Sequence, residues 1–171
     1  MHLVQIRERD LDGGPLTRLV SACLEAVRGT RTRVIVNDRL DVALAAGAHG
    51  VHLRADSFAA PRVRTRAPSP FLIGRSVHSV ADAVAASAAG GLDYLIFGTV
   101  FETASKPGHG VAGLAGVAAV SGATRLPVLA VGGVTPRNAP QVMTAGAAGI
   151  AAIGMFADVD ISALPGLVAR M

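Results

Sequence analysis

The chain of 171 residues has no tryptophan, one tyrosine and one cysteine, and few of its residues are charged. The lone Cys23 cannot form an internal disulfide, and it lies in an apolar helical pattern, which is consistent with a reducing cytoplasm. Charged residues make up 16% of the chain and hydrophobic residues 51%. Because disordered chains are polar and highly charged, this composition predicts a globular protein with a sizeable core.

Long apolar segments are also missing. No run of about 18 apolar residues is free of charges and glycine turns, so we expect no membrane span. Arg7, Glu8, Arg9 and Asp10 stand where a signal peptide needs an apolar segment, and we expect a cytoplasmic protein. The net charge of +4 favours anionic ligands. With no stripe of basic and aromatic residues, nucleic acid is not the expected partner.

Short apolar runs alternate with helical runs rich in alanine and leucine. The expected strands are Leu3–Ile6, Val34–Asn37, Gly50–Leu53, Leu72–Ser76, Tyr94–Gly98, Val128–Gly132 and Ile150–Ile153. The expected helices are Pro15–Arg28, Leu40–Ala46, Ala60–Arg66, Val80–Ala89, Ala112–Ser121 and Asn138–Ala145. This alternation predicts βαβ units and a parallel sheet. Glycines at 47, 90 and 146 are expected to end three of the helices in the left-handed conformation.

Polar residues follow nearly every strand at its C-terminal end. A doubly wound sheet would carry ligand residues at one switch point only, whereas a barrel carries them around its rim. We therefore expect an α/β fold of the TIM (β/α)8-barrel type, forming a single domain over residues 1–171. Only seven strands are visible, so the expected barrel lacks its first βα unit. A shortened chain, a homodimer that covers the open edge, or an unusual open barrel would each account for this.

Two glycine-containing loops follow the last two expected strands. Gly132 and Gly133 end one strand, and Ile153 and Gly154 end the next. Glycines let the backbone approach a phosphate, and the loops after the last two strands of a barrel commonly bind one. The alternative is that these glycines only turn the chain. Two such loops in succession favour the phosphate site.

A polar loop from Thr99 to Gly110 follows another expected strand and contains Glu102, Lys106 and His109. Such a loop can close over a substrate, and Lys106 could neutralise a phosphoryl group. A solvated surface loop is the alternative interpretation.

Further candidates follow the remaining strands. Arg7 suits an anion, although it could instead pair with Glu8. Asp38 could bind Mg²⁺ or cap the helix that follows it. His78 could exchange protons near neutral pH, while Ser79 is the expected helix cap. For His49 and His52 we expect structural roles.

Together these segments resemble the thiamine phosphate synthase/TenI family. The resemblance runs from Leu3 to about Phe156 through five ordered motifs: VQIRERD, IVNDRLDVALAAGAHGVHL, IGRSVHS, DYLIFGTVFETASKPG and PVLAVGGVTPRNAPQVMTAGAAGIA. It implies a β/α barrel that binds a thiazole phosphate. Synthases of the family join this phosphate to a pyrimidine diphosphate with Mg²⁺ and release diphosphate. The TenI branch includes a metal-free thiazole tautomerase.

The two branches predict different site residues. IGRSVHS, Glu102 in place of a usual proline, and Ser57 in place of the second Mg²⁺ aspartate (with Asp56 one residue early) resemble TenI. Arg7, Asn37, Asp38 and Lys106 match the synthase, with Arg9 replacing a usual lysine. The histidine of the tautomerase aligns with Thr99, whose hydroxyl cannot exchange protons as imidazole does.

Our first interpretation is a TenI-like enzyme of thiamine biosynthesis, a thiazole tautomerase without a cofactor. The alternatives are a Mg²⁺-dependent thiamine phosphate synthase, with Asp38 as the metal ligand, and a non-catalytic protein that binds a phosphate ligand. Expected catalytic residues are Thr99, Glu102, His78 and His109. Expected substrate and phosphate ligands are Arg7, Asn37, Lys106, Gly132, Gly133, Ile153 and Gly154.

Overall fold

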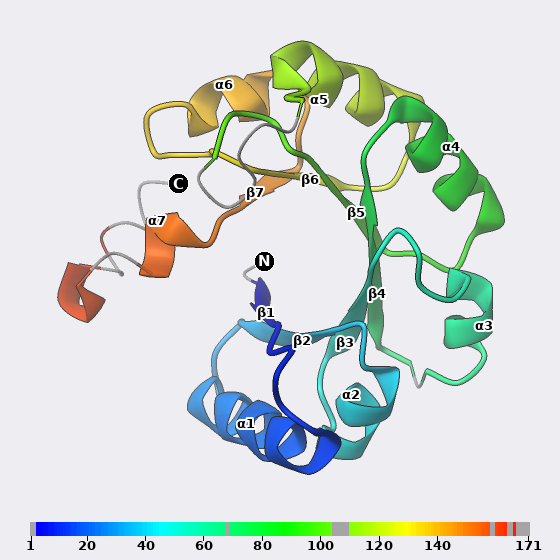
Figure 1. The fold of residues 1–171 in the computed structure, drawn as a ribbon, viewed down its shortest axis with the longest axis vertical. Coiled ribbons are helices and arrows are strands. Elements are labelled where there is room, and N and C mark those ends of the chain that lie inside the picture. The colour runs from blue at the N-terminus through cyan, green and yellow to red at the C-terminus, as the bar shows by residue number, and fades with distance from the viewer. Residues whose placement is uncertain (1–2, 68, 104–109, 158–159, 164–165, 167–171) are drawn as a thin grey trace. The chain divides into compact units, whose positions relative to one another are not determined.

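A computed structural model describes residues 3–67, 69–103, 110–157, 160–163 and 166 of the chain. It contains two compact units: Met1–Ser76 with Ala89–Asp93, called unit 1, and Val77–Ala88 with Tyr94–Met171, called unit 2. Figure 1 shows the same strand–helix repeat in both. None of the helices in the described ranges is long and apolar enough to cross a membrane.

Unit 1 contains the first strands and the helices that connect them. Its elements are β1 (Leu3–Ile6), α1 (Gly13–Ala26), β2 (Arg33–Asn37), α2 (Leu40–Ala46), β3 (Gly50–Leu53), α3 (Ala60–Arg64) and β4 (Leu72–Val77), whose last residue belongs to unit 2. The strands are parallel in the order β1-β2-β3-β4. The register pairs Ile6 with Val36 and Asn37 with His52, so the C-terminal ends of β1, β2 and β3 share one edge.

Unit 2 repeats this arrangement. Its elements are α4 (Val80–Ala89, the last residue of which lies in unit 1), β5 (Tyr94–Phe97), α5 (Gly113–Ala123), β6 (Val128–Val131), α6 (Ala139–Thr144), β7 (Gly149–Ala151), α7 (Gly154–Ala157) and a 3₁₀ turn, Ile161–Ala163. The strands β5, β6 and β7 are parallel neighbours in this order. Phe97 pairs with Ala130 and Val131 with Ala151, which brings the loops after β5 and β6 to one edge.

The strands form where the sequence is apolar, because parallel strands are covered on both faces. In β2, Val34, Ile35 and Val36 are fully buried, and in unit 2 so are Leu95 and Ala130. The predicted strands and helices are all present, and each of their ends lies within two residues of the prediction.

The end of β7 differs more from its prediction than the other strand ends do, and the glycines that end three helices are as predicted. β7 ends at Ala151 instead of Ile153, whose side chain is 68% exposed. Cys23 is half-buried in α1. The glycines after α2, α4 and α6 have φ values of 70°, 75° and 99° at positions 47, 90 and 146, as predicted for left-handed helix ends.

Candidate functional site

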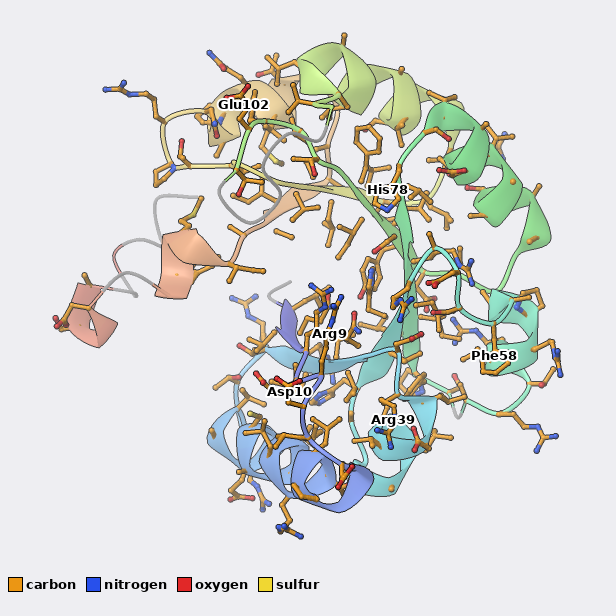
Figure 2. The ribbon with its side chains drawn as sticks, viewed as in Figure 1. Arg9, Asp10, Arg39, Phe58, His78 and Glu102 are labelled. Atoms are coloured by element: carbon orange, nitrogen blue, oxygen red, sulfur yellow. The ribbon has the colours of Figure 1, made fainter. Side chains whose placement is uncertain are left out.

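A pocket of about 360 Å³ lies at the ends of β1, β2 and β3 in unit 1. Its walls are Ile6, Arg7, Glu8, Arg9, Leu11, Leu16, Asn37, Asp38, Arg39 and Arg54. Figure 2 shows Arg9 in the segment after β1 and Arg39 at the beginning of α2. Four arginines and two acidic residues make the wall of this pocket, called the arginine pocket below, net positive. The predicted anion ligands Arg7 and Asn37 thus lie in one pocket.

Asp38 is held in an unusual backbone conformation at the edge of this pocket. Its φ is 58°, and its N–H donates to the carbonyl oxygen of His52 at 2.9 Å. The N-cap position of α2 is Arg39, which makes no side-chain capping bond. The alternative that Asp38 caps this helix is therefore wrong. Its left-handed backbone places Asp38 one residue before the cap, and its carboxylate bonds elsewhere.

The carboxylate of Asp38 is engaged by the loop that follows β3. The Ser57 hydroxyl donates a hydrogen bond to Oδ1 of Asp38. Nη1 of Arg54 lies 3.7 Å from Oδ2, and Nη2 of Arg54 donates to Asp56. This hydrogen bond from Arg54 lowers the pKa of Asp56. The Asp38 carboxylate therefore faces a hydroxyl donor and a cation.

These surroundings do not fit a resident Mg²⁺. Magnesium prefers oxygen ligands with negative charge in a near-octahedral shell. Both oxygens of Asp38 already have a partner: Oδ1 accepts from the Ser57 hydroxyl, and Oδ2 faces the Arg54 guanidinium. The positive charge of Arg54 repels a cation. In the parts of the chain that the structure describes, no three His, Cys, Asp or Glu residues form a group able to hold a metal ion.

The loop after β3 is fixed by Arg75 of β4. The Arg75 guanidinium donates to the carbonyl oxygens of Ala55, Ser57 and Phe58, the first two at 3.1 Å. Three bonds from one side chain order the segment that carries Arg54 and Ser57.

His52 and His49 have the structural roles predicted for them. His49 Nδ1 accepts a hydrogen bond from the Val34 N–H at 3.0 Å. His52 is 2% exposed, and its Nε2 lies 2.8 Å from Ser76 Oγ. Burial, assisted by the Arg75 cation, lowers the pKa of His52 to about 4. His52 is therefore neutral at physiological pH.

In unit 2, Gly132 and Gly133 form a tight turn after β6 against the segment after β5. Their φ values are 102° and 62°. A Cβ at Gly132 would lie 2.6 Å from Cγ2 of Thr99, and one at Gly133 would lie 2.4 Å from the carbonyl oxygen of Glu102. Phe101 N–H donates to Gly132 O at 3.0 Å. Both the conformation and the close approach require glycine here.

The predicted catalytic residues of unit 2 occupy different surroundings. Thr99 lies against Gly132, whereas Glu102 is exposed. The His78 ring donates from Nδ1 to the carbonyl oxygen of Gly98 at 2.7 Å, which ties it to the end of β5. Figure 2 shows His78 and Glu102 on separate segments of unit 2. Ser79 caps α4 as predicted, since its Oγ accepts from the Asp82 N–H at 3.0 Å.

The remaining phosphate candidates follow β7. Gly154 is the first residue of α7, and Ile153 precedes it with an exposed side chain, so only its backbone could serve a ligand. Lys106 and His109 lie outside the described residues.

Sequence reasoning missed three residues that organise these loops. Arg54 stands beside Asp38, Arg75 holds the loop after β3, and Asn138 fastens the turn after β6. Asn138 Oδ1 accepts from Thr135 N–H at 2.7 Å, and its Nδ2 donates to Gly133 O at 3.0 Å. An asparagine three residues after a threonine, just before a helix, is a turn signal that could have revealed it.

Comparison with known proteins identifies relatives of this chain. Residues 1–156 match the family model described as thiamine monophosphate synthase. A thiamine-phosphate synthase of Methanoculleus marisnigri is 44% identical over 152 residues, which cover 88% of this chain and 72% of the relative. A putative thiamine-phosphate synthase of Geobacter sulfurreducens is 41% identical over 159 residues, covering 92% of this chain and 74% of the relative.

A solved structure gives the same result for the fold. The thiamine phosphate pyrophosphorylase from Pyrococcus furiosus superposes with a TM-score of 0.78 at 32% identity, covering 88% of this chain and 71% of the other. The predicted α/β fold of the TIM-barrel type is thereby confirmed. Because the family model matches residues 1–156, which are most of this chain, the chain belongs to the thiamine phosphate synthase family of transferases.

Proposed function

We propose that this protein is a thiamine phosphate synthase, which joins a thiazole phosphate to hydroxymethylpyrimidine diphosphate. The observation that carries this proposal is the arginine pocket of unit 1, because a leaving diphosphate requires several cations around it. Relatives named thiamine-phosphate synthase support it as well. The synthase thus takes precedence over the tautomerase that the sequence favoured first.

The reaction requires one group of residues that binds the diphosphate and another that binds the thiazole phosphate. The thiazole nitrogen attacks the methylene carbon of the pyrimidine, the carbon–oxygen bond to the diphosphate breaks, and diphosphate leaves. Arg7, Arg9 and Arg54 stabilise the negative charge that develops on the leaving group. Asn37 is oriented by Gln5, whose amide donates to it at 2.9 Å, and it offers its own amide N–H groups to the ligand.

The turn after β6 binds the phosphate of the thiazole. Gly132 and Gly133 allow the tight turn against the segment after β5, and the backbone N–H groups of this turn receive the phosphoryl group. The backbone at Ile153 and Gly154 completes this phosphate site.

The tautomerase has weaker support from the geometry. An isomerase that moves a proton needs a base at the reacting carbon, and the aligned position holds Thr99. Glu102, the other candidate base, is exposed to solvent.

Two assays on the purified protein test the proposal. One mixes thiazole phosphate with hydroxymethylpyrimidine diphosphate and follows thiamine phosphate and diphosphate, which we expect in equal amounts. The other supplies the carboxylated thiazole phosphate alone and follows its isomerisation, which we expect to be absent. Isomerisation without condensation would overturn the synthase in favour of the tautomerase. Binding of thiazole phosphate with neither reaction would favour the non-catalytic alternative.

A further inference from the structure

We infer that Arg54 takes the place of a divalent cation in the arginine pocket, so that the pocket binds a diphosphate group without metal. This inference rests on the proposed function, since it assigns the pocket to the diphosphate of the pyrimidine substrate. All the residues involved lie in unit 1.

Arg54 lies beside Asp38 in the wall of the pocket. Its guanidinium lies between two carboxylates, 3.7 Å from Oδ2 of Asp38 and hydrogen-bonded to Asp56. A metal ion bound to Asp38 would have to share this space with a positive charge. The guanidinium therefore lies where a cation attracted by Asp38 would lie, and it supplies the same sign of charge.

Ser57 also faces Asp38. Its hydroxyl donates to Oδ1 of Asp38, and its oxygen carries no charge to offer a metal. Its peptide carbonyl and those of Ala55 and Phe58 are engaged by Arg75. The loop after β3 thus directs hydrogen-bond donors toward Asp38, whereas a metal site requires acceptors there.

The charge of the pocket wall also favours an anion. Arg7, Arg9 and Arg54 line the pocket in which Asp38 and Glu8 are the acidic residues. Arg39 also lines it, and its guanidinium is paired with Asp41 at 2.7 Å. Half of the Arg54 side chain is exposed, so its remaining N–H groups can reach a ligand. A guanidinium binds two phosphoryl oxygens at once and matches a diphosphate better than a point charge does.

Inorganic diphosphate is the probe, and its binding is measured by calorimetry in EDTA and in Mg²⁺. We expect the two affinities to agree within about threefold. R54Q should weaken binding in EDTA at least tenfold, and R54K, which keeps the charge but loses the planar fork, should fall between. R28Q, which changes an exposed arginine of α1 away from the pocket, is the control and should bind as the wild type does.

A second measurement reports on the metal directly. The electron paramagnetic resonance of Mn²⁺ should show no tight binding by the wild type, whereas R54G/S57D, which removes the cation and restores a carboxylate, should bind Mn²⁺. Binding of diphosphate that is lost in EDTA, or that R54Q leaves unchanged, would overturn the inference. If R54Q does not fold, the wild-type comparison between EDTA and Mg²⁺ decides.

The proposed function can fail separately. Suppose that diphosphate binds in EDTA, that this binding depends on Arg54, and that the protein makes no thiamine phosphate. This result would contradict the synthase proposal but would support the metal-free anion site. Synthesis of thiamine phosphate that stops in EDTA would contradict the metal-free site alone.

Discussion

His52 on β3 and Ser76 on β4 join two adjacent strands of unit 1, with 2.8 Å between Nε2 of the ring and the hydroxyl oxygen. The imidazole is 2% exposed, and burial together with the Arg75 cation lowers its pKa to about 4. The neutral ring therefore belongs to the folded protein, and protonation opposes folding.

This depressed pKa predicts a loss of stability in acid. In the unfolded chain the ring titrates near pH 6.5, so below this pH the unfolded state binds the extra proton. The free energy of unfolding should fall as pH drops from about 6.5 to about 4, by about 3 kcal/mol in total from this residue. Urea unfolding at several pH values measures it. H52Q should lose most of this dependence, while H78Q, which leaves His52 in place, should retain it.

Arg64 holds three segments of unit 1 together, and its loss should destabilise the protein. Its guanidinium donates to Phe71 O at 2.6 Å, to Gly91 O at 3.1 Å and to Asp93, which in turn accepts from the N–H of Ile73. R64M should lower the free energy of unfolding by about 1–3 kcal/mol, because several half-buried acceptors lose their donor. R64K should lose less. R66Q, at an exposed neighbouring position, should be near neutral, and an equal loss there would contradict this role.

A methyl group at Gly132 should impair thiazole phosphate binding. G132A introduces a Cβ 2.6 Å from the Thr99 side chain at a φ of 102°, so the turn must move. We expect the affinity for thiazole phosphate to fall at least tenfold, since the backbone N–H groups lose their alignment. Calorimetry measures the affinity. G122A, in α5 where the Cβ meets nothing within 4 Å, is the matched control. Unchanged binding by G132A would remove the turn from the phosphate site.

Much of this architecture could be predicted from the sequence because its elements depend on local patterns. A β-branched apolar run such as Val34–Val36 favours a buried strand, and the glycine at 47 ends α2 in the conformation expected of it. The turn formed by the glycine pair after β6 was also predictable from the sequence, whereas its close approach to Thr99 is seen only in the structure.

The surroundings of Asp38 could not be predicted in this way. Whether its carboxylate caps α2, binds a metal or meets a cation depends on a φ of 58° and on where the loop after β3 returns. Arg54 follows Asp38 by sixteen residues in the chain, and only the parallel pairing of β2 with β3 brings the two side by side. A single sequence shows the residue types but not this pairing, which is why the cation was missed.

His78 provides a test of whether its ring positions the loop after β5 or transfers a proton. The bond from Nδ1 to Gly98 O leaves Nε2 as the atom that could act as a base. Asparagine places an amide N–H near the position of Nδ1 but has nothing at Nε2. A positioning role predicts that H78N keeps kcat within about threefold of the wild type, with the same pH profile, while H78A loses about tenfold or more and raises KM. Steady-state kinetics of thiamine phosphate formation between pH 5.5 and 9 measure both. We expect the positioning result, because the ring is committed to a backbone carbonyl. Equal loss in H78N and H78A, with one limb of the pH profile gone, would instead make His78 the proton-transfer group.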